Sequence, residues 1–243
     1  MAQAYIVDAV RTPVGKRNGS LAGIHPADLG AVTLNALMDR TGIDPGAVED
    51  VVMGCLDTIG PQAGDIARTA WLAAGLPEHV PGTTVDRQCG SSQQAAHFAA
   101  AGVIAGQYDV VVAGGVESMT RVPMLCTVTQ GPGVPFGPRM LARYDDGLVP
   151  QGISAEIIAA RWSLSRHALD EIAVQSHARA AAAADSGAFD AERAGAKPAR
   201  EDITATNGEL RAISPRGTGA GNRRRADRPV AQVAKGVVDL PAR

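Results

Sequence analysis

Short apolar or β-branched runs alternate with helical patterns along the first 115 residues of the chain. Four such runs predict strands, at residues 5–7, 51–53, 83–85 and 110–112. Three stretches with apolar positions at helical spacing predict helices, at residues 26–40, 65–74 and 91–105. Strands that alternate with helices are typical of an α/β fold with a largely parallel sheet.

Turn and cap residues support these boundaries. Gly42, Gly75 and Gly106 each follow a predicted helix, which is the usual place for a helix-ending glycine. Asp44 precedes Pro45, the order expected of an N-cap and a proline at the first helical position. The predicted elements therefore begin and end at residues suited to those positions.

The pattern changes after residue 119. Proline and glycine are frequent between residues 120 and 152, which predicts a long irregular connection or an inserted loop-rich subdomain. Helices are predicted again at residues 154–162 and 166–186, the second with Ser165 as N-cap and Gly187 as its stop. After residue 192 no period is visible, and the composition predicts a disordered tail. We therefore divide the chain into residues 1–119, 120–192 and 193–243.

Composition and charge narrow the classes of protein. The chain has 243 residues, 45% of them hydrophobic and 20% charged, which is ordinary for a soluble globular protein. The net charge of −2 favours neither a nucleic acid nor an anionic membrane as partner. Basic residues exceed acidic ones only after residue 192, where we interpret the run of arginines at 223–225 as solvated rather than as a nucleic-acid patch. No apolar run is long enough to span a membrane, and the N-terminus lacks a signal-peptide pattern, so a cytoplasmic location is expected.

The three cysteines are spread along the chain, at Cys55, Cys89 and Cys126. Their number and spacing favour a reducing compartment over a disulfide scaffold, and without a CxxC pair no metal site is expected. Cys55 follows a predicted strand and is expected to be a buried structural residue. Cys126 lies in the irregular region, and its pattern fits either a structural or a functional residue. The pair Gly114-Gly115 lacks the GxGxxG spacing of a dinucleotide site.

Cys89 is the candidate catalytic residue. It lies between a predicted strand and the start of a predicted helix, and the positive end of a helix stabilises a thiolate. Gly90 leaves room beside the sulfur, and nearby N–H groups could bind a developing oxyanion. Composition alone leaves open the alternative of a small, buried, unreactive cysteine.

The residues around Cys89 resemble the nucleophile segment of the thiolases, which are acetyl-CoA C-acyltransferases. Residues 85–95 read Val-Asp-Arg-Gln-Cys-Gly-Ser-Ser-Gln-Gln-Ala. Four further stretches resemble the same family in the same order, at residues 8–15, 114–120, 151–156 and 165–192. The flanks of Cys89 resemble thiolases more than the ketoacyl synthases of the wider fold. The resemblance implies a thiolase-like fold, with residues 1–119 as its N-terminal βαβαβ half and residues 120–192 as its loop subdomain.

The resemblance also implies a reaction. The Cys89 thiolate would attack a 3-ketoacyl-CoA, form an acyl-cysteine and release acetyl-CoA, and CoA would then take the acyl group. CoA and acyl-CoA are thus the expected substrates, in lipid metabolism such as fatty acid β-oxidation, with no tightly bound cofactor. The family assembles as dimers or tetramers. No CoA-binding residue is assigned.

Three motifs of the family's second half do not occur in this chain. They are Gly-His-Pro, whose histidine activates the nucleophile, the proton-shuttling Cys-x-Gly-Gly, and Asn-Glu-Ala-Phe. None of the five histidines (His25, His79, His97, His167 and His177) matches these roles. We therefore expect a truncated, impaired chain without the C-terminal half, its tail after Glu192 arising from a frameshift or from natural divergence. The alternative function is a non-catalytic half that binds acyl-CoA or a partner chain.

Two further expectations follow. Pro150 and Gln151 replace a His-Met pair that lines the acyl pocket in many thiolases, which favours an acyl group bulkier than acetoacetyl. The helix at residues 91–105 is apolar on nearly all faces and requires cover on all of them. Without the second half, we expect the chain to aggregate or to stay partly molten.

Overall fold

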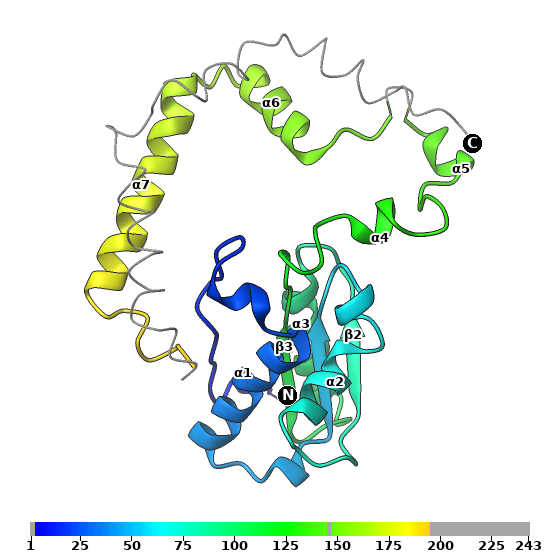
Figure 1. The fold of residues 1–243 in the computed structure, drawn as a ribbon, viewed down its shortest axis with the longest axis vertical. Coiled ribbons are helices and arrows are strands. Elements are labelled where there is room, and N and C mark those ends of the chain that lie inside the picture. Colours follow the sequence, from blue (N-terminus) through cyan, green and yellow to red (C-terminus); the bar gives the residue numbers. More distant parts are fainter. Residues whose placement is uncertain (1–2, 145–146, 195–243) are drawn as a thin grey trace.

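A three-stranded parallel sheet forms the centre of the molecule (Figure 1). The computed structural model describes residues 3–144 and 147–194. The strands are β1 (Asp50–Gly54), β2 (Gly82–Val85) and β3 (Val111–Gly115), and their order is β2-β1-β3. Val52 lies opposite Thr83 on one side and Ala113 on the other. The predicted α/β fold is confirmed.

Three helices cover the two faces of this sheet (Figure 1). α1 (Pro26–Thr41) and α2 (Ile66–Ala73) pack on one face, and α3 (Ser91–Ile104) packs on the other. Alternate residues of β1 point to opposite faces, as a strand requires. Val51 and Met53 therefore enter the core beneath α1 and α2, whereas Gly54 faces the first turn of α3.

The main hydrophobic core lies between the sheet and the helices α1 and α2. Trp71, which is fully buried, is the largest side chain in it, and its indole N–H donates to the Pro77 carbonyl at 2.8 Å. Aliphatic side chains from both helices and from the strands surround the ring: Leu34, Met38, Val51, Met53, Ile66, Val80 and Val112. With so few aromatics, branched aliphatics and alanines fill most of this volume.

The predicted helix ends are confirmed. Gly42, Gly75 and Gly106 have φ between 65° and 74°, the left-handed conformation that glycine adopts without strain. Asp44 accepts a hydrogen bond from the Gly46 N–H at 2.9 Å and begins a short 3₁₀ helix (Pro45–Ala47). Two other 3₁₀ helices lie at Ser20–Gly23 and Gly60–Gln62.

The strand predicted at residues 5–7 is wrong for the described part of the chain. Tyr5, Ile6 and Val7 are 79%, 90% and 74% exposed and belong to no strand. A strand needs a partner for its backbone N–H and C=O groups, and no described segment pairs with these residues. An apolar run is therefore insufficient where the pairing strand is not among the described residues.

Four helices between residues 126 and 185 form a row that curves away from the sheet, and we name this row of helices, without the undescribed residues 145 and 146, the helical arc (Figure 1). It contains α4 (Cys126–Thr129), α5 (Pro138–Leu141), α6 (Gln151–Arg161) and α7 (Arg166–Asp185). The two longer helices match the predicted ones, although α6 begins three residues earlier. Ser165 caps α7 by accepting from the Ala168 N–H at 3.1 Å. The predicted disordered tail lies outside the described residues from 195 onwards.

One face of α3 is open to solvent in the described chain. Phe98 and Ile104 are 53% and 52% exposed, whereas Ala95 and Ala99 on the sheet side are buried. The expectation that this helix requires cover on all of its faces stays a prediction. Aggregation of the chain stays a prediction.

Candidate active site

The carboxyl ends of the three parallel strands lie at one edge of the sheet, and Cys89 lies near that edge. The chain leaves β2 at Val85 and enters α3 at Ser91, so Cys89 is in the short turn between them. Cys89 is exposed, whereas Cys55 and Cys126 are buried. Of the two readings that the sequence left open for Cys89, the buried one is excluded by this placement.

The turn that carries Cys89, residues 86–91, is held by hydrogen bonds at both ends. We name it the cysteine turn. Asp86 accepts from the Gln88 N–H at 2.8 Å, and Ser91 Oγ accepts from the Arg87 N–H at 2.9 Å and donates to the Gln88 carbonyl at 2.5 Å. Gln88 has a φ of 50°, an uncommon conformation for a non-glycine residue. The strained Gln88 backbone and these bonds together fix the direction in which Cys89 leaves the turn.

Two glycines allow the first turn of α3 to lie directly on the strand ends. A Cβ atom on Gly54 would overlap the backbone of Ser91 and Ser92, and a Cβ atom on Gly115 would overlap the Ser92 side chain. Both glycines have ordinary φ values, so closeness and not backbone freedom explains them. The packing of Ser92 on Gly54 and Gly115 therefore sets the height of the cysteine turn above the sheet.

The amino end of α3 points its first N–H groups toward this turn. Gly90 is the N-cap residue, and no side chain caps the helix. The N–H groups of Gly90 and Ser91 donate to the carbonyls of Arg87 and Gln88, each at 3.1 Å. These two donors are thus engaged within the turn, and an oxyanion at Cys89 would compete with those carbonyls for them. The positive end of the 14-residue helix acts on Cys89 in either case.

No histidine of the described residues is hydrogen-bonded to Cys89. His25 instead caps α1, its Nδ1 accepting from the Ala27 N–H, and His79 contacts the Gly46 carbonyl. A groove of about 840 Å³ lies between residues 11–18 and 115–124, and Cys89 is not part of its lining. Among the described residues, neither these histidine contacts nor the groove supplies a hydrogen-bonded base for Cys89.

Cys55 has the opposite environment to Cys89. Burial, and after it the nearby carboxylate of Glu117, raise the pKa of its thiol from the ordinary 9.0 to about 12. The Cys55 Sγ lies 4.0 Å from Glu117 Oε1. The Cys55 thiol is therefore neutral at physiological pH, and the burial that the sequence predicted for it is confirmed.

Because of this pKa shift, the free energy of unfolding of the chain changes with pH in the alkaline range. The folded thiol ionises only near pH 12, whereas the unfolded thiol ionises near pH 9.0, so stability is full below pH 9.0 and falls above it. We expect Cys55 to contribute a slope of at most about 1.4 kcal/mol per pH unit in this window. Urea unfolding between pH 8 and 11 measures it, and Cys55→Ala should lack the slope. Equal slopes in the two proteins would contradict the assignment.

A polar network behind the cysteine turn was not predicted from the sequence. The Glu117 carboxylate accepts from the Leu56 N–H at 2.7 Å and from Gln62 Nε2 at 2.7 Å. Gln62, fully buried, also donates to the Asp57 carbonyl at 2.8 Å and accepts from the Ser118 N–H at 2.6 Å. The network joins the segments that follow β1 and β3. Three of these four bonds join residues more than fifty positions apart in sequence, so no local pattern signals them.

Removing the centre of this network is expected to be costly. Gln62→Leu leaves the buried Ser118 N–H and part of the Glu117 carboxylate without partners, whereas the Asp57 carbonyl keeps the Ile59 N–H at 2.8 Å, and the loss should lower the free energy of unfolding by about 2 kcal/mol. Chemical denaturation measures the loss. The matched control is Gln175→Leu on the exposed face of α7, with an expected change below about 0.5 kcal/mol. A similar small change for Gln62→Leu would show that the network is dispensable.

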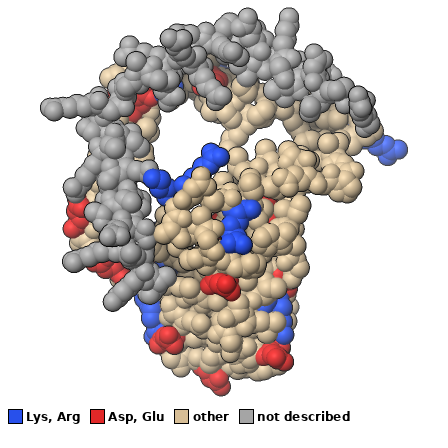
Figure 2. All heavy atoms as spheres, viewed as in Figure 1, with Lys and Arg blue, Asp and Glu red and all other residues tan. Residues whose placement is uncertain are grey.

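Several kinds of site find no support in the described part of the chain. No group of three or more histidine, cysteine or acidic side chains there could hold a metal ion. None of its helices combines the length and apolar character needed to cross a membrane. On the face shown in Figure 2, basic and acidic side chains are interspersed and form no continuous basic stripe.

The protein therefore has an α/β fold. At the carboxyl edge of its sheet, the exposed Cys89 lies just before the first residue of a helix that packs on the sheet. The sequence model of the family described as "Thiolase, N-terminal domain" matches residues 4–209, most of the chain and beyond the last quoted motif. The chain belongs to the thiolase family.

Named relatives agree with this assignment. The chain is 52% identical over 198 residues to the "Steroid 3-ketoacyl-CoA thiolase FadA6" of Mycobacterium tuberculosis. This match covers 79% of this chain and 49% of that protein. It is 38% identical over 206 residues to the "Beta-ketoadipyl-CoA thiolase" of Acinetobacter baylyi, covering 78% and 50%. Among solved structures, the acetyl-CoA acetyltransferase of Bacillus anthracis matches with a TM-score of 0.65 and 32% identity, covering 79% of this chain and 50% of that one. The chain thus spans about half the length of these relatives.

Proposed function

We propose that this chain carries the nucleophile of a thiolase-type acyltransferase, and that Cys89 forms the acyl-cysteine intermediate. The observation that carries the proposal is the exposed Cys89 at the amino end of α3, on a turn that is pinned at both ends. Membership of the thiolase family supports it. Acyl-CoA and CoA are then the substrates, and no tightly bound cofactor is required.

The chemistry that this chain's own residues supply is the formation of one thioester from another. The Cys89 sulfur attacks the acyl carbonyl, the carbonyl-to-leaving-group bond breaks, and the proton of the thiol passes to the leaving group. With acetyl-CoA the leaving group is CoA, and with a 3-ketoacyl-CoA it is the carbanion of acetyl-CoA. Exchange between thioesters is nearly isoenergetic, so a thiol nucleophile needs no energy input.

For the substrate we propose a 3-ketoacyl-CoA with a bulky acyl group, of the steroid-derived class. The name of the relative with 52% identity supports this class. Pro150 and Gln151, at the start of α6, stand where many thiolases have a His-Met pair that lines the acyl pocket, as the family resemblance implies. Reaction in lipid breakdown, in the manner of β-oxidation, is the corresponding proposal for the pathway type.

Three further points belong to the proposal. We retain the division at residues 119/120 and 192/193, with a nucleophile-bearing part, a loop subdomain and a tail. We also propose a cytoplasmic location and, for the complete enzyme, a homodimer or tetramer. The activating histidine and the second cysteine that the family uses are expected in the part of the relatives' length that this chain does not span.

A second candidate function is a non-catalytic half that binds acyl-CoA or a partner chain. The observation that favours it is the absence of a histidine beside Cys89 in the described residues, together with the exposed apolar face of α3. A chain that binds CoA near Cys89, but whose Cys89 thiol does not exchange with thioesters, would fit this function.

Incubation of the chain with acetyl-CoA separates the two. The acyltransferase proposal predicts a stoichiometric release of free CoA and a parallel loss of Cys89 alkylation by iodoacetamide. The binding alternative predicts CoA binding by calorimetry with no release of CoA and an unacylated Cys89. The second result would overturn the proposal.

A further inference from the structure

The helical arc is held to the rest of the molecule near both of its ends. α5 and α7 contain no buried residue, and α6 contains one, Ala159. The arc curves over the side of the molecule to which the carboxyl ends of the strands point (Figure 1). Since its helices are not packed on the sheet, the contacts at its two ends determine where it lies.

The first attachment is at the start of the arc. Asp57, 2% exposed, accepts from the N–H groups of Leu125 and Thr127 at 3.1 and 3.3 Å and from the Thr127 hydroxyl at 2.7 Å. Asp57 follows β1, so this end of the arc is fixed to the sheet edge itself. Three donors satisfy the carboxylate, which makes this attachment a rigid one.

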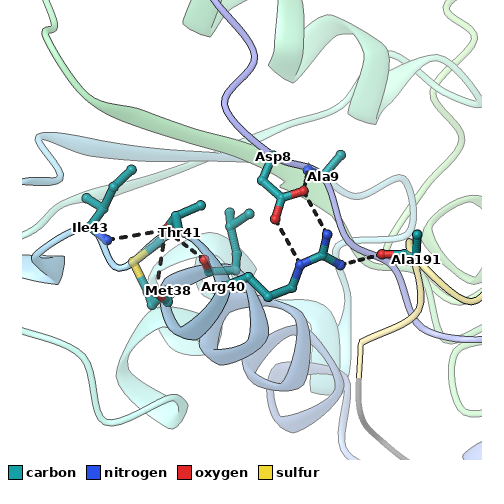
Figure 3. Close-up of polar contacts among 8 residues, drawn as sticks. Asp8, Ala9, Met38, Arg40, Thr41, Ile43 and Ala191 are labelled. Atoms are coloured by element: carbon teal, nitrogen blue, oxygen red, sulfur yellow. Dashed lines mark hydrogen bonds and ion pairs between the residues drawn. The ribbon is translucent and has the colours of Figure 1, made fainter.

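The second attachment is at the return of the arc, around Arg40 at the end of α1 (Figure 3). The Arg40 guanidinium donates through Nε and Nη2 to both oxygens of Asp8, at 2.9 and 3.0 Å. Its Nη1 donates to the Ala191 carbonyl at 2.6 Å. One planar cation therefore holds three segments together: α1, the N-terminal segment and the segment after α7. A lysine could not reproduce this fork.

Arg11 reinforces the same junction. Its backbone N–H donates to the Glu192 carbonyl and its carbonyl accepts from the Ala194 N–H, each at 2.8 Å. Its side chain forms an ion pair with Glu192 at 2.7 Å and lies over the Phe189 ring. The hydrogen bonds and the ion pair of Arg11 join the N-terminal segment to the returning segment, whereas Arg40 ties both segments to α1, so Arg40 anchors the junction to the core.

From this arrangement we propose that Arg40 is a positioning residue: its fork onto Asp8 and Ala191 sets the orientation of the helical arc relative to Cys89 and thereby the affinity for acyl-CoA. This inference rests on the proposed acyl transfer to Cys89. The arc offers exposed apolar side chains for an acyl group, among them Ile157, Ile158 and Trp162 on and just after α6. Without the fork, the arc keeps its helices and its first attachment but loses its fixed orientation.

The test compares Cys89 acylation by acetyl-CoA with Cys89 alkylation by iodoacetamide in the full chain. Arg40→Met should raise the acetyl-CoA concentration for half-maximal acylation about fivefold, because a charged fork and one hydrogen bond are lost. Iodoacetamide is too small to need the arc, so its rate should stay unchanged. Asp8→Asn keeps the bond to Ala191 and should give a smaller rise, as should Arg40→Lys. The matched control is Arg166→Met, which removes an exposed pair within α7.

Hydrogen exchange gives a readout that does not depend on acylation. The Ala194 N–H should exchange faster in Arg40→Met than in the parent chain and Arg166→Met. An unchanged half-maximal concentration in Arg40→Met, or an equal fall of acylation and alkylation, would overturn the positioning role while leaving the proposed function intact. Failure of the parent chain to become acylated would instead overturn the proposed function, and the positioning role with it.

Discussion

Replacing Cys89 with alanine is expected to abolish the release of CoA from acetyl-CoA by this chain. The nucleophilic sulfur is the atom that bonds to the acyl carbon, and neither of the other two thiols can replace it. Cys55 and Cys126 are buried, and burial keeps the Cys55 thiol neutral. We expect the rate of CoA release to fall to the uncatalysed background. A thiol-reactive dye that reports free CoA measures the rate.

The matched control is Cys126→Ala, which removes a buried thiol beside the start of the helical arc and should leave CoA release within about threefold of the parent. Circular dichroism must show that both variants keep the helices. If Cys89→Ala still releases CoA at the parent rate, the acyl acceptor is another group and the assignment of Cys89 fails.

Gly54→Ala is expected to have the largest effect on the fold around Cys89. The added Cβ overlaps the backbone of Ser91 and Ser92, which cannot rotate away as a side-chain end could. The first turn of α3 must then lift off the strand ends, at a cost of about 3 kcal/mol or more in the free energy of unfolding. Because the cysteine turn is continuous with α3, the rate of Cys89 alkylation should change as well.

Gly114→Ala is the matched control for this substitution. Gly114 lies in β3 opposite Met53, and a Cβ atom there meets nothing within 4 Å. Its free energy of unfolding should stay within about 1 kcal/mol of the parent chain, and Cys89 should react at the parent rate. Similar melting curves for Gly54→Ala and Gly114→Ala would contradict the idea that close packing on the strand ends positions the turn.

The elements with strong local signals could be predicted from the sequence. α3 runs over Ser91–Ile104, within one residue of the predicted helix, because apolar spacing and Gly106 define both its body and its end. β1 follows the Val-rich run at residues 51–53 for a similar reason, since a strand buried on both faces is apolar throughout. β3 also begins within a Val-rich run, although only Val112 of its residues is buried. The placement of Cys89 between strand and helix was predictable for the same reason.

Features that depend on distant partners could not be predicted. The run Tyr5-Ile6-Val7 has strand composition but no described partner to pair with. Gln62 lies between Pro61 and Ala63 with no local sign of its burial, and its partners Glu117 and Ser118 follow another strand. The same holds for Arg40, whose bond to the Ala191 carbonyl spans 151 residues. Such contacts follow from the packing of the whole chain and have no sequence period.

The family resemblance indicates the type of reaction, which neither the hydrophobic period of the sequence nor the geometry of the site supplies. A cysteine at a helix N-terminus is compatible with several reactions, and only the ordered motifs and the match over residues 4–209 connect it with thioester chemistry. The matched part of this chain spans about half the length of these relatives, so their activity as whole proteins is a hypothesis for it. The account therefore depends on what Cys89 itself does.

The most direct measurement is a pulse and chase with isotope-labelled acetyl-CoA. After the pulse, proteolysis and mass spectrometry should place the acetyl group on Cys89 and on neither Cys55 nor Cys126. A chase with unlabelled CoA should then remove the label from Cys89 and return it as acetyl-CoA. A chain with no label on Cys89 after the pulse, or with a label that CoA cannot remove, would contradict acyl transfer through this cysteine.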